Sequence, residues 1–283
     1  MLTWWQAVVL GLVEGITEYL PVSSTGHLIL ASSLMHLDHP QTKDALDAYL
    51  VVVQGGAILA VALLYRERVG QMIRGVLGRD TEGLRLAGNI ALAFVPAAIA
   101  GALLSKSIKA VLFRDAPVLL ALFVGGVWMI WLGRRGGRAG NDVTAMTWRT
   151  ALGVGLFQTL ALWPGTSRSM VTIGGGILLG LAAPAAAEFS FLLGLPTLGA
   201  ACLHDLVGNV RHAAEGDGPS MFQQLGTGPL VLGILVATVS AMIAVRWLVA
   251  FLTRRGLAPF GWYRIVLSIV LGLLIASGVV AVG

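Results

Sequence analysis

Apolar runs about as long as a membrane span recur along the whole chain, and they restrict what it can fold into. A helix needs about 20 apolar residues to cross the hydrocarbon core of a bilayer. The runs lie at about 48–65, 86–104, 117–133, 184–203, 229–252 and 263–282. Only 12% of the residues are charged, against about 25% in soluble domains, so a soluble fold would have almost no polar surface. The sequence therefore predicts an all-α polytopic membrane protein with six transmembrane helices.

The first residues, the single cysteine and the net charge exclude several other classes of protein. Met1-Leu-Thr-Trp-Trp has neither the basic start nor the small-residue cleavage motif of a signal peptide, so we expect no cleaved one. Cys202 is the only cysteine, which excludes an internal disulfide and a cysteine metal site. The net charge of +5 comes from arginines beside the apolar runs, which is typical of a topology signal and of lipid headgroup contact. We expect the bilayer, and no nucleic acid, as a partner.

Three arginine-rich loops determine the predicted topology. They contain Arg66, Arg68, Arg74, Arg79 and Arg85, then Arg134, Arg135, Arg138 and Arg149, and finally Arg254, Arg255 and Arg264. The positive-inside rule places all three loops in the cytoplasm. The loop at 105–116, with Lys106, Lys109 and Arg114, must then lie outside, against the rule.

The number of crossings between these loops predicts a hairpin that does not cross. Between the second and third basic loops lie 150–182, 184–203 and 229–252, and an odd number of crossings cannot return the chain to the same side. The stretch 150–182 is broken by Pro164-Gly165, so we predict that it enters and leaves by one face. A re-entrant hairpin is tolerated where protein buries it or where it lines a wet cavity. The stretch 4–36, broken by Pro21, has the same pattern.

The two halves of the chain, about 1–133 and 150–283, then follow one plan. Each half is a proline-broken hairpin followed by three spans, and three spans between the hairpins make them enter from opposite faces. This is an inverted-topology repeat, in which paired broken segments point to the binding site. The segment Glu18-Tyr-Leu-Pro-Val-Ser-Ser-Thr aligns without a gap, though weakly, with Ala161-Leu-Trp-Pro-Gly-Thr-Ser-Arg.

Two glutamates lie in the first broken segment. Glu14 and Glu18 are four residues apart and share a helix face, where like charges repel. Each acidic group at bilayer depth costs about 2.5–3.5 kcal/mol. If the hairpin lies at the membrane surface, the carboxylates simply face water. At depth they need a proton, a basic partner or a metal ion.

The same segment continues with hydroxyl groups and a histidine. Pro21 ends the first half-helix, and Ser23, Ser24 or Thr25 can cap the next one. In a helix that begins near Ser23, Ser24 and His27 lie on one face within reach of each other. A serine-rich helix start is common, but beside two carboxylates the histidine indicates a catalytic group.

The second broken segment contains a buried cation. Arg168 is costly at membrane depth, but it offers bidentate recognition of phosphate or carboxylate, or a structural ion pair with Glu14 or Glu18. After Pro164-Gly165, Thr166 or Ser167 can open a helix whose N-terminus is a ready anion site. Further candidates for substrate binding are Gln158, Gly165, Ser167, Ser169 and Thr172.

Taken together, the two segments predict one phosphate-handling site. Two half-helix N-termini and Arg168 attract an anion, while Glu14 and Glu18 repel it unless a divalent cation lies between them. Mg²⁺ or Ca²⁺ suits two carboxylates plus substrate phosphates. The combination indicates phosphoryl transfer from a diphosphate, and a site within the membrane indicates a lipid substrate.

The quoted residues also resemble a known family. The run from Glu14 to His27 (EGITEYLPVSSTGH) and the run Pro164-Gly-Thr-Ser-Arg-Ser with Thr172 closely resemble the two signature motifs of undecaprenyl-diphosphate phosphatase, the bacterial bacitracin-resistance family. Val53-Gln-Gly-Gly, Ala187-Glu-Phe-Ser and Tyr263-Arg-Ile also look like family segments. The resemblance therefore covers essentially the whole chain.

The resemblance implies a divalent-cation-dependent hydrolase of the bacterial inner membrane. It implies removal of the terminal phosphate of a C55 isoprenoid diphosphate, which regenerates the carrier for peptidoglycan synthesis, in a site open to the outer face and in a homodimer. It implies that Glu14 and Glu18 act as metal or acid/base carboxylates, that Arg168 binds diphosphate, and that Ser24 or His27 is the nucleophile or its activator. Ser23, Thr25, Ser167, Ser169 and Thr172 would contact phosphate. Glu188, outside both motifs, is expected to have a supporting role.

Other functions stay open at this point. A lipid transporter or flippase uses the same inverted-repeat architecture, although binding alone does not require so many acid, hydroxyl and histidine groups. An acid-phosphatase-type lipid phosphatase needs a second histidine with an aspartate, and the other four histidines lie in or beside polar loops without that pattern. Within the phosphatase hypothesis, Ser24, His27 and a water molecule all remain candidate nucleophiles.

Overall fold

The computed structural model of the chain describes residues 2–37, 43–112, 114–134, 140–216 and 218–280. Its α-helices are α1 (Trp4–Thr17), α2 (Ser24–Leu34), α3 (Lys43–Leu64), α4 (Arg66–Val76), α5 (Thr81–Leu112), α6 (Asp115–Arg134), α7 (Trp148–Thr159), α8 (Arg168–Leu178), α9 (Ala183–Ala214), α10 (Met221–Leu225), α11 (Thr227–Arg255) and α12 (Ala258–Ala276). Two 3₁₀ turns are η1 (Val143–Ala145) and η2 (Leu160–Leu162). No β-strand occurs in these ranges, and the predicted all-α class is confirmed.

Six helices in the described ranges are long and apolar enough to cross a membrane, as predicted. They are α3, residues 81–104 of α5, α6, α9, α11 and α12. The last span ends at Ala276 rather than near 282, because Gly278 adopts a φ of +73°, a left-handed conformation that commonly ends helices. Residues 281–282 of the predicted run lie outside the described residues.

The two proline-containing stretches each form two short helices, as their breaks predict. In the first stretch, residues 18–23 separate α1 from α2, and in the second, 160–167 separate α7 from α8. Pro21 and Pro164 lie inside these breaks, since proline lacks the N–H that would continue a helix. Ser23 and Ser167 are the N-caps of α2 and α8, and both have a positive φ, of 76° and 73°.

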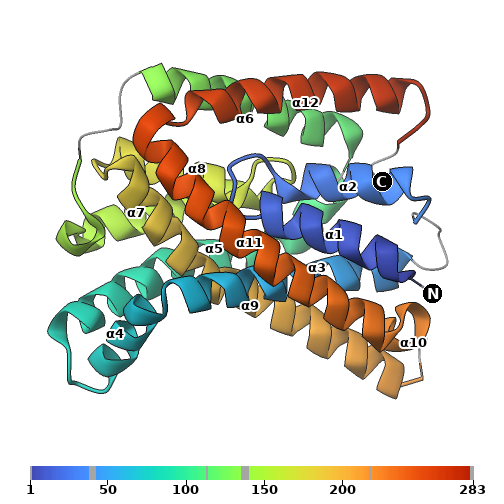
Figure 1. Cartoon of the computed structure of the whole chain (residues 1–283), viewed down its shortest axis with the longest axis horizontal. Coiled ribbons are helices and arrows are strands. Elements are labelled where there is room, and N and C mark those ends of the chain that lie inside the picture. Colours follow the sequence, from blue (N-terminus) through green and yellow to red (C-terminus); the bar gives the residue numbers. More distant parts are fainter. Residues whose placement is uncertain (1, 38–42, 113, 135–139, 217, 281–283) are drawn as a thin grey trace.

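The two broken stretches lie toward opposite ends of the molecule (Figure 1). Helices α1 and α2 lie in the half that contains the N-terminus and α10, whereas α7 and α8 lie in the half that contains α4. The arginine-rich segments at α4, at the start of α7 and at the end of α11 share that second end (Figure 1). Arg135 and Arg138, which the topology prediction also used, lie outside the described residues.

One arginine assigned to a basic loop is in a different place. The sequence prediction put Arg264 in the third cytoplasmic loop, but it lies inside α12 and its side chain is fully buried. Its guanidinium finds hydrogen-bond acceptors in the backbone carbonyls of Ala121 and Gly165, at 3.0 and 2.8 Å. These bonds offset part of the cost of burying the charge, so the assignment to a loop was wrong.

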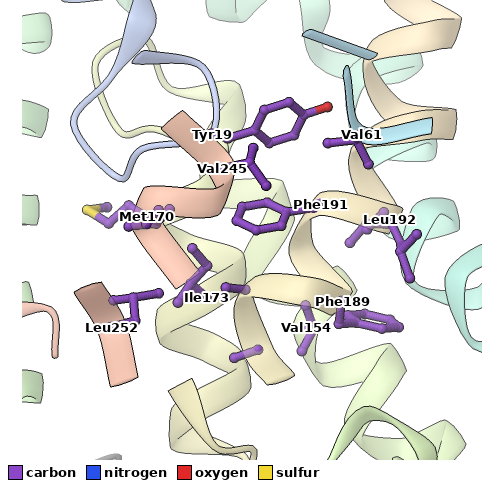
Figure 2. Packing of buried hydrophobic residues seen from close by; sticks show 14 of the residues in the cluster. Tyr19, Val61, Val154, Met170, Ile173, Phe189, Phe191, Leu192, Val245 and Leu252 are labelled. Carbon is purple, nitrogen blue, oxygen red and sulfur yellow. The ribbon is translucent and has the colours of Figure 1, made fainter. Parts of the chain in front are cut away.

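A hydrophobic core lies just beyond the tip of the first broken stretch (Figure 2). Tyr19 and Phe191 of α9 are both fully buried and meet edge to face, with ring centroids 5.2 Å apart. Val245 of α11 lies beside them (Figure 2). The core therefore holds the end of α1 against two of the spanning helices.

Close packing of α1 on α11 positions the carboxylates that α1 carries. Gly11 and Gly15, four residues apart, lie on one face of α1, where their missing side chains let the two backbones approach. A Cβ at Gly15 would overlap the Ala237 carbonyl oxygen and the Ser240 hydroxyl. The spacing matches the small-residue pairs that allow helices to associate in membranes.

We predict that Gly15→Ala lowers the free energy of unfolding by about 1–3 kcal/mol, because the added methyl group overpacks this contact. Thermal unfolding of the purified protein in detergent checks the change. The control is Gly88→Ala in α5, where nothing described lies within 4 Å of the added Cβ. Equal unfolding temperatures for the two variants would contradict the predicted contact.

Candidate active site

A buried ion pair joins the two broken stretches. The Arg168 Nη2 atom of α8 lies 2.9 Å from Glu18 Oε1, and the two side chains are 8% and 7% exposed. The Nη1 atom of Arg168 donates to the Ser190 carbonyl of α9 at 2.9 Å, and its guanidinium lies over the Tyr19 ring. The two polar clusters, 150 residues apart in sequence, therefore meet, and the ion pair that the sequence allowed as an alternative role of Arg168 is present with Glu18.

Glu18 also accepts a hydrogen bond from a serine hydroxyl. Ser24 Oγ, in the first turn of α2, donates to Glu18 Oε2 at 2.8 Å. One carboxylate thus binds a guanidinium through one oxygen and a hydroxyl through the other. A carboxylate so placed can accept the proton of Ser24, which is what activation of a serine nucleophile requires.

Glu14, one turn before Glu18, is fully buried and neither of its side-chain oxygens has a partner among the described residues. Leaving a buried carboxylate unpaired is costly, so a ligand or a proton is expected there. The described residues contain no group of three His, Cys, Asp or Glu side chains that could hold a metal ion. Mg²⁺ commonly binds through one or two carboxylates plus substrate phosphates, and Glu14 with Glu18 fits that donor set.

Ser24 and His27 both lie on α2, three residues apart, and the hydrogen bonds of His27 in the described part of the chain go to other partners than Ser24. Its Nδ1 atom lies 2.7 Å from the Ser23 carbonyl oxygen, and its Nε2 atom lies 2.6 Å from the hydroxyl of Tyr263 in α12. Since a carbonyl only accepts, Nδ1 carries a proton. Both ring nitrogens are therefore engaged by these two partners. Sequence reasoning gave Tyr263 no role at the site.

The second broken stretch supplies a set of linked hydroxyl groups. Ser167 caps α8 by accepting from the Met170 N–H, and its hydroxyl lies 3.0 Å from that of Ser169. Ser169 donates to the Leu20 carbonyl of the other stretch at 2.9 Å. Ser169 therefore makes a second link between the stretches.

Thr172 lies one turn further along α8. Its hydroxyl is 2.6 Å from that of Ser190 and 3.4 Å from the Ser169 carbonyl oxygen. Ser190, which faces both Thr172 and Arg168, was not among the predicted residues. Ser190 ends the segment Ala187-Glu-Phe-Ser that the family resemblance includes, but only Glu188 of that segment was assigned a role.

Within the described residues, no hydrogen bond joins the remaining candidates to Glu18 or Arg168. Gly165, with a φ of +87°, presents its carbonyl to Arg264, and Thr25 is exposed at the start of α2. Gln158 is buried and accepts a hydrogen bond from Thr197 rather than from a member of the ion pair. Glu188 pairs with Arg68 on α4 at 2.8 Å, which agrees with a supporting role.

Fold and site together define a polytopic α-helical membrane protein with a buried centre of carboxylates, guanidinium and hydroxyls. Residues 7–270 of the chain match the family described as "Bacitracin resistance protein BacA". The chain belongs to this family, as its motifs indicated.

Curated relatives cover nearly the whole chain. An undecaprenyl-diphosphatase of Sorangium cellulosum is 48% identical over 94% of this chain and 84% of its own length. Undecaprenyl-diphosphatase 2 of Rhodospirillum rubrum is 44% identical over 98% of this chain and 96% of its own. An undecaprenyl-diphosphatase of Deinococcus radiodurans is 43% identical over 99% and 98%.

We predict that Glu18→Gln destabilises the fold by about 3–5 kcal/mol, because it leaves the buried Arg168 charge without its counter-ion. The double variant Glu18→Gln, Arg168→Met should recover part of that loss, since it removes the stranded charge. Thermal unfolding in detergent measures both effects.

The matched control is Glu188→Gln. Its partner Arg68 is 28% exposed and so remains partly solvated after the substitution. Glu188→Gln should therefore lower the free energy of unfolding clearly less than Glu18→Gln does. If Glu18→Gln and Glu188→Gln cost the same, the ion pair between the stretches would not have the energetic weight assigned to it here.

Proposed function

We propose that this chain is an integral membrane phosphatase that hydrolyses undecaprenyl diphosphate to undecaprenyl phosphate and inorganic phosphate. This activity would recycle the lipid carrier of peptidoglycan synthesis and confer bacitracin resistance. One observation carries the proposal: Glu18 contacts both the Ser24 hydroxyl and the Arg168 guanidinium, so a nucleophile, its base and a phosphate-binding cation lie at one point. The curated relatives named undecaprenyl-diphosphatase support the choice of substrate.

In the proposed reaction Ser24 attacks the terminal phosphorus. Its proton passes to Glu18 Oε2, 2.8 Å away, as the bond between Oγ and phosphorus forms. The bond from that phosphorus to the bridging oxygen breaks, and undecaprenyl phosphate leaves with the electron pair. Water then hydrolyses the phosphoserine, with Glu18 as acid and base, and inorganic phosphate is released. His27, whose two ring nitrogens are engaged by Ser23 and Tyr263, is assigned to positioning the start of α2.

Arg168 and the two helix starts would bind the diphosphate. Arg168 Nε is a buried donor without a hydrogen-bond partner among the described residues, so it is available to a phosphate oxygen. Ser23 provides no side-chain cap for α2, which leaves the first N–H groups of that helix free for an anion. Ser167, Ser169, Thr172 and Thr25 would complete the phosphate contacts from the two segments.

We assign a divalent cation, Mg²⁺ or Ca²⁺, to Glu14 and Glu18. Bound there, the cation would neutralise charge on the diphosphate as the bridging bond breaks. The unpaired oxygens of Glu14 support the assignment, since a buried carboxylate of this kind needs a positive partner.

The membrane arrangement is part of the proposal. The two broken stretches would be re-entrant hairpins of an inverted-topology repeat, with halves at about 1–133 and 150–283, in a bacterial inner membrane. The similar backbone angles of Ser23 and Ser167 support this symmetry. They match Ser23 with Ser167, whereas the gapless sequence alignment matches Ser24 with Ser167, so the two correspondences differ by one residue. The site would open to the outer face, and the protein would form a homodimer, as the family resemblance implies.

No specific observation favours the transporter alternative. Next to Arg168 lies Tyr19, whose ring contacts Phe191, and Phe191 in turn contacts Tyr65 near the end of α3.

The purified protein should release phosphate from undecaprenyl diphosphate with Mg²⁺ or Ca²⁺ and lose that activity in excess chelator. Arg168→Lys should lower kcat/KM by about 10²–10³-fold, because a single ammonium cannot serve Glu18, Ser190 and phosphate together. A colorimetric phosphate assay measures both. Full activity of Arg168→Lys, or undiminished release in chelator, would contradict the proposal.

Ser24→Ala should reduce turnover by at least about 10³-fold, since it removes the attacking oxygen. Ser32→Ala is the control on the same helix, because the Ser32 hydroxyl is buried without a partner and its loss should leave turnover unchanged. Substantial turnover by Ser24→Ala would exclude serine attack and leave His27 or water as the nucleophile.

A further inference from the structure

A cavity with charged lining residues includes neither Glu18 nor Arg168 in its wall. Its volume is about 570 Å³, which is within the usual range for a small-molecule site. It is lined by the end of α3, the start of α4 and parts of α9 and α11, and its charged lining residues are Arg66, Glu67, Arg68, Glu188 and Arg246. Three guanidinium groups and two carboxylates leave an excess of positive charge.

The charges in this cavity are only partly compensated. Arg68 donates to Glu188 and to Gln71, so that arginine has its counter-ion. Arg66 and Arg246 are exposed and form no ion pair within the described parts of the chain. Glu67, exposed beside Arg66, likewise forms no ion pair there, so after the Arg68–Glu188 pair the cavity retains two guanidiniums and one carboxylate, a net charge of +1 that favours an anion.

Of the two unpaired arginines, Arg246 says more about the ligand, because of its position in α11. It lies nine residues before the end of α11, about 13 Å along the helix axis, and α11 is a membrane-spanning candidate. Its neighbours Ile243 and Trp247 are 66% and 49% exposed, as expected for residues that face lipid. A charge among lipid-facing residues is costly unless it pairs with an anion or reaches the headgroup layer.

Helix α4 places the cavity at a membrane surface. It carries Arg66, Arg68 and Arg74, while its apolar Ile73 and Val76 are 56% and 69% exposed. A short helix with a basic side and exposed apolar residues is typical of one that lies in the headgroup layer. The positive-inside rule assigns this end of the molecule to the cytoplasm.

Apolar side chains continue from the cavity toward the middle of the membrane. Leu63 and Leu59 of α3 are 54% and 51% exposed, and Val239 of α11 is 60% exposed. The cavity wall itself includes Leu63 and Met242. An anion that binds at the arginines therefore has a place for hydrocarbon chains beside it.

We propose that this cavity binds the phosphate group of an anionic phospholipid in the cytoplasmic leaflet, with Arg246 and Arg66 as the phosphate ligands. The exposed apolar residues of α3 and α11 hold the acyl chains, which distinguishes this ligand from free phosphate. The residues that line the cavity include neither Glu18 nor Arg168, and the rings of Phe191 and Tyr19 link Tyr65 at the cavity wall to Arg168. The lipid site is therefore distinct from the candidate active site and does not rest on the proposed function.

Native mass spectrometry of the purified full chain in detergent tests the proposal, with dioleoylphosphatidylglycerol as the anionic probe and dioleoylphosphatidylcholine as the zwitterionic one. The wild type should bind phosphatidylglycerol more tightly than phosphatidylcholine. Arg246→Gln should weaken phosphatidylglycerol binding by about fivefold, because one basic residue near a membrane surface contributes about that much to attraction of an anionic lipid. Arg66→Gln should weaken it similarly and serves as a second variant if Arg246→Gln does not fold.

The matched control is Arg255→Gln, an exposed arginine at the end of the same helix that does not line the cavity. It should bind phosphatidylglycerol as the wild type does. Equal affinity of wild type, Arg246→Gln and Arg66→Gln overturns the proposal, and so does an equal loss in Arg255→Gln. If millimolar inorganic phosphate displaces the lipid completely, the site recognises a free anion and the lipid assignment is wrong.

Discussion

A carboxylate and a guanidinium buried against each other, Glu18 and Arg168, link the two halves of this chain. Each group alone would be costly to bury in an apolar protein interior, and their attraction offsets part of that cost only if their positions are fixed. The fixed positions come from the surroundings: Tyr19 stacks beside the guanidinium, and the Ser190 carbonyl accepts from it. Because Glu18 also accepts from Ser24, the same pair orients the proposed nucleophile.

The helix breaks allow Glu18, Ser24 and Arg168 to come together. A continuous helix would have satisfied its own backbone groups and carried Ser24 and Arg168 along its side, whereas the breaks place each of them in a first helical turn. Close packing then holds the broken pieces, as Gly15 does against α11. Arg264 has a similar role deeper in the protein, since it binds the carbonyl of Gly165 in the second break. Buried polar contacts thus stabilise the segments that do not follow regular helix geometry.

Much of this arrangement could be predicted from the sequence, because the relevant signals are local. Apolar runs predict the six spans, and Pro21 and Pro164 predict the breaks. Because a buried charge needs a counter-ion, the sequence allowed two roles for Arg168, phosphate binding or an ion pair with a glutamate, and did not choose between them. The partners of His27 could not be predicted in this way: Tyr263 is 236 residues away, and only the rotation of α12 about its axis brings its hydroxyl to the imidazole. The burial of Arg264 was missed for the same reason.

The stereochemical course at the terminal phosphorus tests the central claim most directly, namely that Ser24, held by Glu18, attacks first and water second. The substrate is undecaprenyl diphosphate with an isotopically chiral terminal thiophosphate, hydrolysed in labelled water by the wild-type protein. Two successive in-line displacements predict retention of configuration in the released thiophosphate. Inversion would mean one direct attack by water, and would contradict a phosphoserine at Ser24.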